Sequence, residues 1–147
     1  MSEFLFGSHV ISRSVVFFQS RLSYAFVNRR PILPGHVLVS PKRVVMRFAD
    51  MTPDEVKDLF IATHQIVPAI ERHYRGTATN IAIQDGKEAG QSVQHIHVHI
   101  IPRKQGDFEN TDDVYKKLQS HDKDDSTKFR SPEDMAQEAS ELAELFK

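Results

Sequence analysis

Three histidines occupy alternate positions of the segment Val93–Ile101, and isoleucine or valine fills the positions between them. Successive side chains of a β-strand point to opposite faces of a sheet. The pattern therefore predicts a strand over Val93–Arg103, with an apolar face packed on the core and an open face that carries His95, His97 and His99. Packing gains nothing from a row of three imidazoles, so this face is the candidate functional site.

A metal site is the first chemistry that such a row suggests. Zinc–nitrogen bonds of about 2.0–2.1 Å suit two imidazoles two positions apart. His95 and His99, however, would lie roughly 13 Å apart along a strand. One ion cannot bind all three rings, so a further ligand such as His36 would have to come from elsewhere, and the chain has no cysteine. We therefore expect no metal ion held by the protein itself.

Nucleophilic and acid–base chemistry fits the row of histidines better. A neutral imidazole is a nucleophile near pH 7, and neighbouring histidines on the same face oppose its protonation. Hydrogen bonds from the flanking rings can stabilise the charged oxygens of a transferring phosphoryl group. The preceding loop, Gly90-Gln91-Ser92, permits close approach of the backbone, and its N–H groups could contact phosphate oxygens.

Short apolar runs predict the other strands. Ser14–Gln19 and Leu22–Asn28 are rich in β-branched and aromatic residues and lie close together, which favours an antiparallel hairpin. His36–Ser40 and Asn80–Gln84 are each typical of one further strand.

A long helix has clear start and stop signals. Thr52 and Glu55 form a capping box, Pro53 fits the first helical position, and the apolar spacing that follows predicts a helix that stops at Gly76. Pro68 lies inside this helix and lacks an N–H group. We expect it to kink the helix without dividing it.

The stretch from Lys104 to Arg130 is dominated by charged residues. It is predicted to hold a short helical piece near Asp113–Leu118 and few apolar anchors. Residues from about 106 to 128 should therefore form a mobile loop, which we expect to fold over the substrate. Ser131–Asp134 then begins a last helix.

Composition indicates one ordinary domain over residues 1–147, because 39% of the residues are hydrophobic and 27% are charged. Strand-rich halves around one long helix and one C-terminal helix predict an α+β fold. Nineteen basic residues balance twenty acidic ones, so nucleic acid is not an expected partner. No apolar run approaches the ~20 residues of a membrane span. We expect a cytoplasmic location, with the nucleus and mitochondria as alternatives.

The histidine segment and its surroundings resemble a known family. The pattern His95–Ile101 is similar to the motif of the histidine triad family, and the neighbouring motifs are similar to its fragile histidine triad branch. These motifs are Asn28-Arg29, Pro34–Val39, Gln84–Gly86, Gly90–Val93, Pro102-Arg103, Gly106–Phe108 and Val114-Tyr115. The resemblance covers nearly the whole chain.

This resemblance implies a fold and an activity. It implies a roughly five-stranded antiparallel sheet in each protomer of a homodimer, with the two sheets continuous. The implied activity is that of a bis(5′-adenosyl)-triphosphatase, which splits diadenosine triphosphate into AMP and ADP through a covalent nucleotidyl-histidine intermediate. Any Mg²⁺ or Mn²⁺ should be bound through the substrate phosphates and not enclosed by the protein.

The resemblance also implies roles for individual residues. His97 would attack the α-phosphorus, His99 would contact phosphate oxygens, and His95 with His36 would set hydrogen bonding and tautomer around the nucleophile. The remaining positions would bind substrate: the polyphosphate at Gln84, Gly90, Gln91, Ser92 and Val93, the ribose at Asn28, and the nucleoside end at His9.

Three alternatives bear on this interpretation. The Hint-type branch, which hydrolyses nucleoside phosphoramidates and adenylates, usually has a C-terminal tryptophan, and this chain has none. The galactose-1-phosphate uridylyltransferase branch has glutamine at the position of His99 and uses cysteine ligands. A nucleotide-loaded signalling module, in which slow hydrolysis ends the signal, has the same motifs. The sequence leaves open whether three or four phosphates are preferred.

Overall fold

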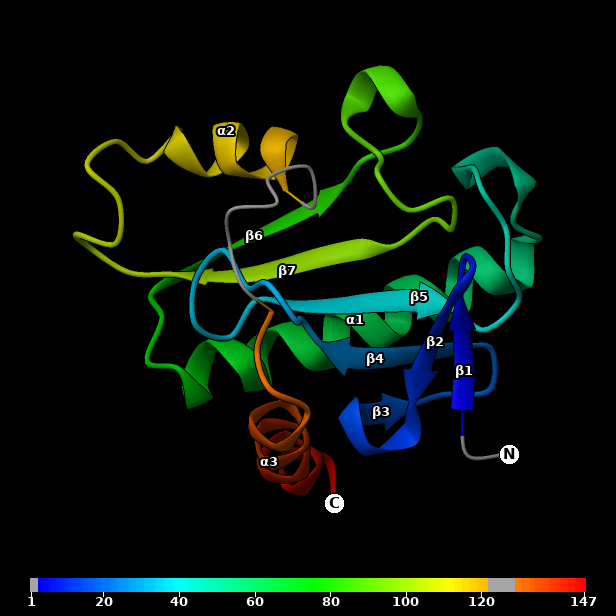
Figure 1. The fold of residues 1–147 in the computed structure, drawn as a ribbon, viewed down its shortest axis with the longest axis horizontal. Coiled ribbons are helices and arrows are strands. Elements are labelled where there is room, and N and C mark those ends of the chain that lie inside the picture. Colours follow the sequence, from blue (N-terminus) through cyan, green and yellow to red (C-terminus); the bar gives the residue numbers. More distant parts are fainter. Residues whose placement is uncertain (1–2, 122–128) are drawn as a thin grey trace.

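The structure is a computed structural model that describes residues 3–121 and 129–147. Its centre is one antiparallel five-stranded sheet with the strand order β3-β4-β5-β7-β6 (Figure 1). The strands are β3 (Val16–Gln19), β4 (Ser23–Val27), β5 (Val37–Pro41), β6 (Ala78–Ile83) and β7 (Val98–Arg103). The hairpin and the two single strands expected from the apolar runs are thus confirmed, as is the α+β class.

A second, two-stranded sheet was not expected from the sequence. Strands β1 (Glu3–Phe6) and β2 (His9–Ser12) form an antiparallel hairpin that crosses in front of the main sheet in Figure 1. Its rings pack on those of β4: Phe4 stacks on Tyr24 at 4.5 Å, and Phe6 meets Phe26 at 5.1 Å. Such short strands give a weak sequence pattern, and these tertiary contacts stabilise the hairpin.

The long helix α1 (Pro53–His73) begins as predicted. Thr52 Oγ1 accepts from the Glu55 N–H at 3.1 Å, and Glu55 Oε1 accepts from the Thr52 N–H at 2.8 Å. The helix runs through Pro68 as one element, and the kink there stays a prediction. Its end differs from expectation, because Arg75 and not Gly76 has a positive φ, of 58°.

Gly76 follows the end of α1 and lies close to β7. Its N–H donates to the Glu71 carbonyl at 2.8 Å, and a Cβ at this position would lie 3.1 Å from the Arg103 carbonyl oxygen. The chain therefore passes close to β7 here, and a larger residue would require a shift of a few tenths of an ångström.

The C-terminal helix and several short 3₁₀ turns complete the ends and connections of the fold. Helix α3 (Pro132–Ala143) starts at Ser131, whose side chain accepts from the Asp134 N–H, and it buries Ala139 and Leu142. The short 3₁₀ turns are η1 (Arg13–Val15), η2 (Phe48–Asp50), η3 (Lys87–Ala89) and η4 (Glu144–Phe146). Over the described ranges, every helix is too short or too polar to cross a membrane.

Helix α2 (Asp113–Ser120) lies beside β6 and β7 and is anchored more firmly than its charge suggests (Figure 1). Val114 and Leu118 are buried with Ile101 in a small apolar cluster. The expectation of few apolar anchors is therefore wrong for this helix. Residues 122–128 lie outside the described residues, and the mobility of the segment from 106 to 128 stays a prediction.

Candidate active site

The sheet register places His99 on the face of the main sheet that the β1–β2 hairpin covers. Phe26, Leu38, His99 and Ala82 stand opposite one another across β4, β5, β7 and β6. Residues directly opposite across paired strands share a face. Because Phe6 of the hairpin packs on Phe26, this is the face that the hairpin covers.

The other two histidines are not on a strand, because β7 begins only at Val98. The prediction of a strand from Val93 is wrong for its first half. Extending the register would pair Ile96 with Pro41, which has no N–H group to donate. Ile96 instead donates its N–H to the Val45 carbonyl at 2.8 Å, and its own carbonyl accepts from the Ser40 hydroxyl at 3.2 Å.

The ring of His95 is fully buried and fixed at both nitrogens. Nδ1 accepts from the Gly7 N–H at 2.9 Å, so Nε2 carries the proton and donates to the Pro41 carbonyl at 2.9 Å. Burial lowers the pKa of His95, which favours this neutral form. The expected open face is thus closed here, and His95 ties the hairpin turn to the end of β5.

The tautomer of His97 is set by backbone and not by another imidazole. Its Nδ1 lies 2.8 Å from the His95 carbonyl oxygen, which can only accept, so Nδ1 carries the proton. In the neutral ring the lone pair is then on Nε2. The edge of Phe6 packs against the ring at 4.9 Å, and the ring of His99 lies 4.8 Å away. This is the nitrogen that a nucleophilic role would use.

His36 and His99 form a directed pair. His36 Nδ1 accepts from the Ile32 N–H at 2.9 Å, so His36 Nε2 donates to His99 Nδ1 at 3.0 Å. The Asn28 amide, at 3.4 Å from His36 Nε2, is the weaker contact. His99 must then carry its own proton on Nε2. That buried atom has no hydrogen-bond partner within the described residues.

Electrostatics keep this pair neutral. Burial is the main cause that lowers the pKa of both His36 and His99 well below 6.5, and the neighbouring rings of His97 and His121 lower both further. An orphaned N–H in such a site is costly unless a ligand accepts from it. His99 Nε2–H is therefore suited to an anionic oxygen placed beside His97.

The buried histidines predict a stability that depends on pH. Their folded pKa values lie below the ordinary 6.5, so the unfolded chain binds more protons as the pH falls through 6.5. The free energy of unfolding should fall between pH 7.5 and 5.5, by up to about 1.4 kcal/mol per pH unit for each of His36, His95 and His99. Urea unfolding at several pH values measures this slope.

Carboxylates contribute little in the same window. The pKa of Glu55 is lowered to about 2, mainly by its hydrogen bond with Arg43, so its contribution is lost only at much lower pH. The variant His95→Gln should reduce the slope by about a third, because one of three buried histidines is gone. A slope unchanged by that substitution would contradict the assignment.

In the predicted polyphosphate loop, Gly90–Val93, several polar groups already form hydrogen bonds within the protein. The N–H groups of Gly90 and Gln91 donate to the carbonyls of Lys87 and Gly86, and the Gln91 side-chain amide donates to the Met46 carbonyl. Gly90 and Gln91 therefore cannot offer these groups to phosphate in this conformation. The roles of Ser92 and Val93 in binding polyphosphate stay predictions.

Gln84 lies at the end of helix α2. Its Nε2 donates to the Leu118 carbonyl at 3.2 Å. Gly90 packs beside it with φ +98°, and a Cβ there would lie 2.4 Å from Gln84 Nε2. The positive φ explains the glycine, and the role of Gln84 as a polyphosphate ligand stays a prediction.

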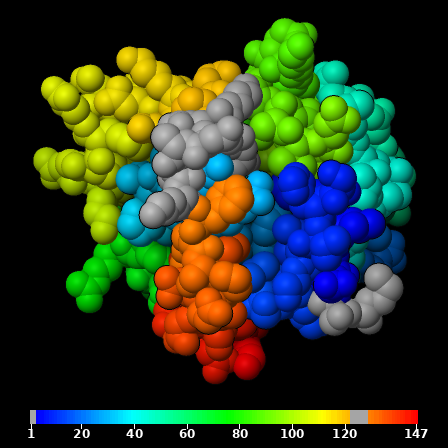
Figure 2. Space-filling view, in the orientation of Figure 1, coloured from blue at the N-terminus to red at the C-terminus, as the bar shows by residue number. Residues whose placement is uncertain are grey.

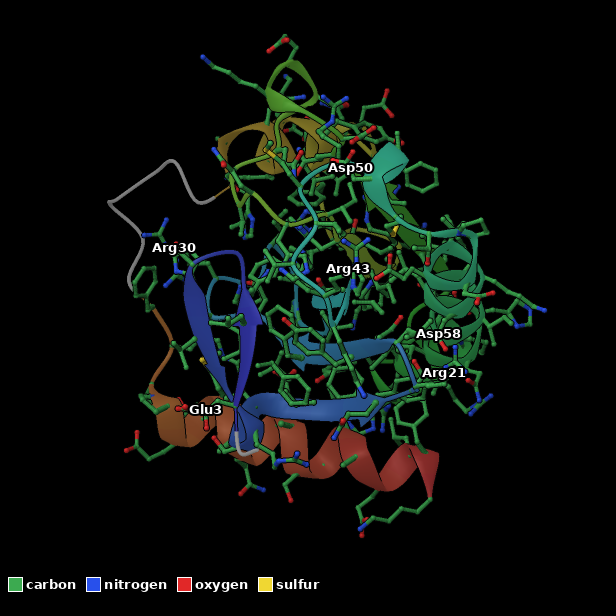
Figure 3. All side chains as sticks on the ribbon, turned by 90° about the vertical axis from the view of Figure 1, so that its right-hand side faces the viewer. Glu3, Arg21, Arg30, Arg43, Asp50 and Asp58 are labelled. Atoms are coloured by element: carbon green, nitrogen blue, oxygen red, sulfur yellow. The ribbon has the colours of Figure 1, made fainter. Side chains whose placement is uncertain are left out.

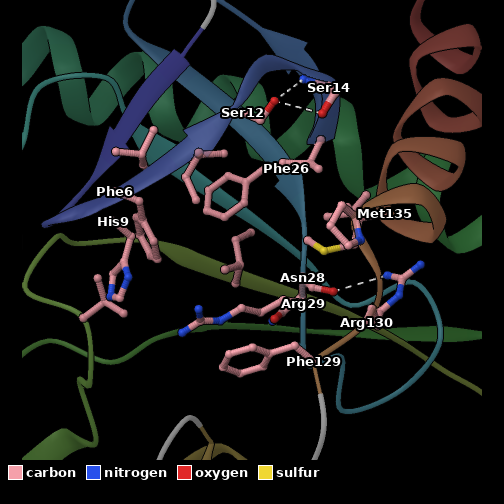
Figure 4. A pocket seen from close by; sticks show the side chains of 17 residues that line it. Phe6, His9, Ser12, Ser14, Phe26, Asn28, Arg29, Phe129, Arg130 and Met135 are labelled. Carbon is pink, nitrogen blue, oxygen red and sulfur yellow. Dashed lines mark hydrogen bonds between the residues drawn. The ribbon is translucent and has the colours of Figure 1, made fainter.

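A cavity of about 430 Å³ (Figure 4) is lined by Phe6, whose ring packs on His97, and by Asn28, whose amide contacts His36, but His36, His95, His97 and His99 are not among its lining residues. Strand β2, the end of β4 and the segment that leads into α3 surround it, and the hairpin and α3 flank this face in Figure 2. Among its lining residues are the predicted ligands His9, Asn28 and Val93. Most of the wall is apolar, with Phe26 and Met135 opposite one another in Figure 4. Its volume suits one nucleoside-sized ligand.

Sequence reasoning missed two parts of this site. His121 lies 5.3 Å from His36 between ring centroids, and Phe129 with Arg130 forms one cavity wall. Phe129 faces the guanidinium of Arg29 at 4.1 Å, and Arg130 donates to the Asn28 carbonyl at 3.2 Å. No motif marked these residues, because only folding brings them to Asn28 and His36.

Metal binding finds no support in the side chains that the structure describes. No group of three or more His, Cys, Asp or Glu residues in residues 3–121 and 129–147 is arranged to hold an ion. The expectation that no metal is held by the protein itself stays a prediction.

Fold and site together define a class of protein: an α+β domain with a buried histidine cluster at one sheet face beside a nucleoside-sized cavity. Comparison with known proteins identifies the family. The HIT domain family matches residues 10–106. The chain is 47% identical over 146 residues to a bis(5′-adenosyl)-triphosphatase of Dictyostelium discoideum, covering 99% of this chain and 95% of that protein.

Two other relatives extend the comparison. An asymmetrical bis(5′-nucleosyl)-tetraphosphatase of Schizosaccharomyces pombe is 52% identical over 109 residues, which are 74% of this chain and 60% of that protein. The crystal structure of the C. elegans NitFhit protein superimposes with a TM-score of 0.82 at 40% identity, covering 98% of this chain and 30% of that one. The chain belongs to the HIT domain family.

Proposed function

We propose that this protein is a dinucleoside polyphosphate hydrolase that cleaves diadenosine triphosphate into AMP and ADP. The observation that carries the proposal is the pair of adjacent imidazoles with opposite roles. His97 presents a lone pair on Nε2, and His99 presents a buried N–H on Nε2 with no protein acceptor in the described residues. The similarity to relatives named for this reaction supports the same substrate class.

In the first step His97 Nε2 attacks the α-phosphorus, and the bond from that phosphorus to the bridging oxygen breaks to release ADP. The N–H group at His97 Nδ1 keeps its hydrogen bond to the His95 carbonyl oxygen. This hydrogen bond stabilises the positive charge that the ring gains. His99 Nε2–H donates to a non-bridging oxygen of the transferred group. The adenosine of that group occupies the cavity beside Asn28.

In the second step water attacks the phosphorus of the His97–AMP intermediate and loses a proton to solvent, the bond from phosphorus to His97 Nε2 breaks, AMP leaves, and Nε2 recovers its lone pair. Each step is an in-line displacement that inverts configuration, so the two together retain it. Hydrolysis in ¹⁸O-water should therefore put the label only in AMP, and a chirally labelled α-phosphorus should keep its configuration. Mass spectrometry and ³¹P NMR measure these two results. Inversion would contradict the covalent route.

Comparison of substrates tests the function itself. We expect kcat/KM to be higher for diadenosine triphosphate than for an adenosine phosphoramidate, and the opposite order would favour the Hint-type activity. Diadenosine tetraphosphate belongs in the same series, because one relative is named for tetraphosphate hydrolysis. A His97→Asn variant that binds substrate without cleaving it, yet keeps a cellular effect, would favour the signalling alternative.

A divalent cation, Mg²⁺ or Mn²⁺, is proposed to bind through the substrate phosphates. Such an ion would neutralise charge on the departing ADP. The described residues offer no site arranged to hold it alone. The cytoplasmic location expected from the sequence also stays a prediction.

A homodimer is the assembly we propose. Strand β6 is an edge of the main sheet, and its Ile81 is 53% exposed although its cross-strand neighbour Ile100 is fully buried. Exposed edges with apolar residues favour pairing with another chain. Pairing of two β6 strands about a two-fold axis would join the sheets.

The dimer has a direct test. Sedimentation at micromolar concentration should give the mass of two chains, and Ile81→Lys should shift it toward one. Leu5→Lys is the matched control, because Leu5 is equally exposed at 53% but lies on the β1–β2 hairpin. A monomeric wild-type protein would contradict the proposal.

A further inference from the structure

His121 reaches the histidine cluster from the end of α2. Its ring centroid lies 5.3 Å from that of His36 and 5.9 Å from that of His99. Its Nε2 lies 2.7 Å from the Arg30 carbonyl oxygen, which only accepts, so Nε2 donates. We propose that His121 is a positioning residue that holds the His36–His99 pair in register for phosphoryl contact. The inference rests on the role proposed above for His99.

The carbonyl that His121 binds is central to the loop between β4 and β5, where Figure 3 labels Arg30. On one side of it, the Arg30 N–H donates to Asn28 Oδ1 at 2.9 Å. On the other, the Ile32 N–H donates to His36 Nδ1 at 2.9 Å. Fixing the Arg30 carbonyl therefore restrains both the proposed ribose ligand and the bond that sets the tautomer of His36.

His121 also contacts His99, so the contacts among the loop, His36, His99 and His121 form a ring. His36 Nε2 donates to His99 Nδ1, and His99 meets the ring of His121 nearly edge-on, at 80° between the ring planes. The loop, His36, His99 and His121 thus restrain one another in turn. No acceptor in the described residues binds the Nε2–H group of His99. The direction of this N–H group therefore depends only on the orientation of the His99 ring.

Helix α2, which holds His121 at its C-terminal end, is packed against the main sheet. Leu118 is buried against Ile101 of β7, and the N–H of His121 donates to the Leu118 carbonyl at 3.3 Å. That carbonyl also accepts from Gln84. The last turn of α2 thereby connects β7, Gln84 and the His36–His99 pair. A histidine on a solvent-exposed surface would make none of these connections.

Substitutions at His121 separate its hydrogen bond from its bulk. His121→Phe keeps a ring but cannot donate, and His121→Gln keeps an N–H donor near the Arg30 carbonyl. We expect kcat for diadenosine triphosphate to fall about 10-fold to 100-fold in the first variant, with KM changed by less than about threefold, because misplacement of a reacting group acts on the chemical step. The glutamine variant should retain kcat within about threefold. His73→Gln, at an exposed position of α1, is the control and should change neither constant.

Two further measurements test coupling to His99. In a His99→Asn background, His121→Phe should lower kcat by no more than about twofold, because residues that act through one another are not additive. In the substrate-free protein, the imidazole proton between His36 and His99 should exchange with solvent at least about fivefold faster in His121→Phe, as seen by ¹⁵N-edited NMR.

The outcomes are distinguishable. Unchanged kcat and unchanged proton exchange in His121→Phe would overturn the inference while leaving the proposed function intact, and so would an effect confined to KM. Absence of wild-type turnover would remove the proposed function, and the exchange measurement would still decide whether His121 holds the pair. If His121→Phe does not fold, as judged by urea unfolding, His121→Leu has the same expected results and is measured in its place.

Discussion

Replacing His97 with asparagine should lower turnover of diadenosine triphosphate by at least about 10⁴-fold while substrate affinity stays within about threefold. The substitution removes the Nε2 lone pair that attacks phosphorus but leaves an amide that can still donate to the His95 carbonyl. Binding depends mainly on the cavity and the phosphate contacts, which the variant keeps. Single-turnover assays with equilibrium binding measure the two quantities separately.

The matched control for this experiment is His73→Asn, which makes the same chemical change at an exposed position and should leave turnover unchanged. Substantial turnover by His97→Asn would refute a covalent intermediate on that residue. A large loss of affinity would instead mean that His97 contributes to ground-state binding.

The flanking histidines should behave differently from His97 and from each other. His99→Asn should lower turnover less, because it removes a hydrogen bond to phosphate and not the atom that forms the new bond. His95→Asn should also be milder in turnover, and we expect it to lower the free energy of unfolding by about 1–3 kcal/mol. Its ring bonds Gly7 and Pro41 in a fully buried position, so its loss leaves polar groups without partners.

Replacing Gly35 with alanine should lower the free energy of unfolding by about 2–5 kcal/mol, the largest stability effect we expect from one added methyl group. Gly35 has φ +89°, and a Cβ there would lie 2.6 Å from Tyr74 Cδ2 and 2.7 Å from Pro102 Cγ. The substitution combines backbone strain with overpacking. Because His36 follows directly, turnover should fall as well.

Gly106→Ala separates these two causes. Gly106 has a similar φ of +82°, but nothing lies within 4 Å of a Cβ built there. Only the backbone strain of about 1–2 kcal/mol should remain. Urea unfolding of both variants measures the difference, and equal losses would contradict the proposed overpacking at Gly35.

The positions of several elements were predictable because their causes are local. The capping box at Thr52 and Glu55 needs only residues three apart, and it starts α1 as expected. The run His36–Ser40 was likewise predicted to form a strand, and the structure has β5 at Val37–Pro41. The charge-rich segment was predictable only in part, since the short helix is present but its burial against Ile101 depends on a partner outside it.

The histidine triplet shows where such reasoning stops. Alternation predicted three equivalent rings on one strand, and His99 does lie on β7. His95 and His97 precede the strand because β5 ends at a proline, which cannot extend the ladder. The consequence is three different environments: a ring locked by hydrogen bonds, a ring with its lone pair on Nε2, and a ring with an orphaned N–H.

The sequence by itself determined the α+β class, the long helix and most strands of the main sheet, and its resemblance to the histidine triad family made His97 the candidate nucleophile. Tertiary structure decided the tautomers, the burial of His95 and the entry of His121 into the site. The physical reason is the separation of the partners along the chain. Gly7 bonds His95 from 88 residues away, and His121 bonds the Arg30 carbonyl from 91 residues away. Local rules act over a few residues, so only the folded chain could bring these hydrogen bonds together.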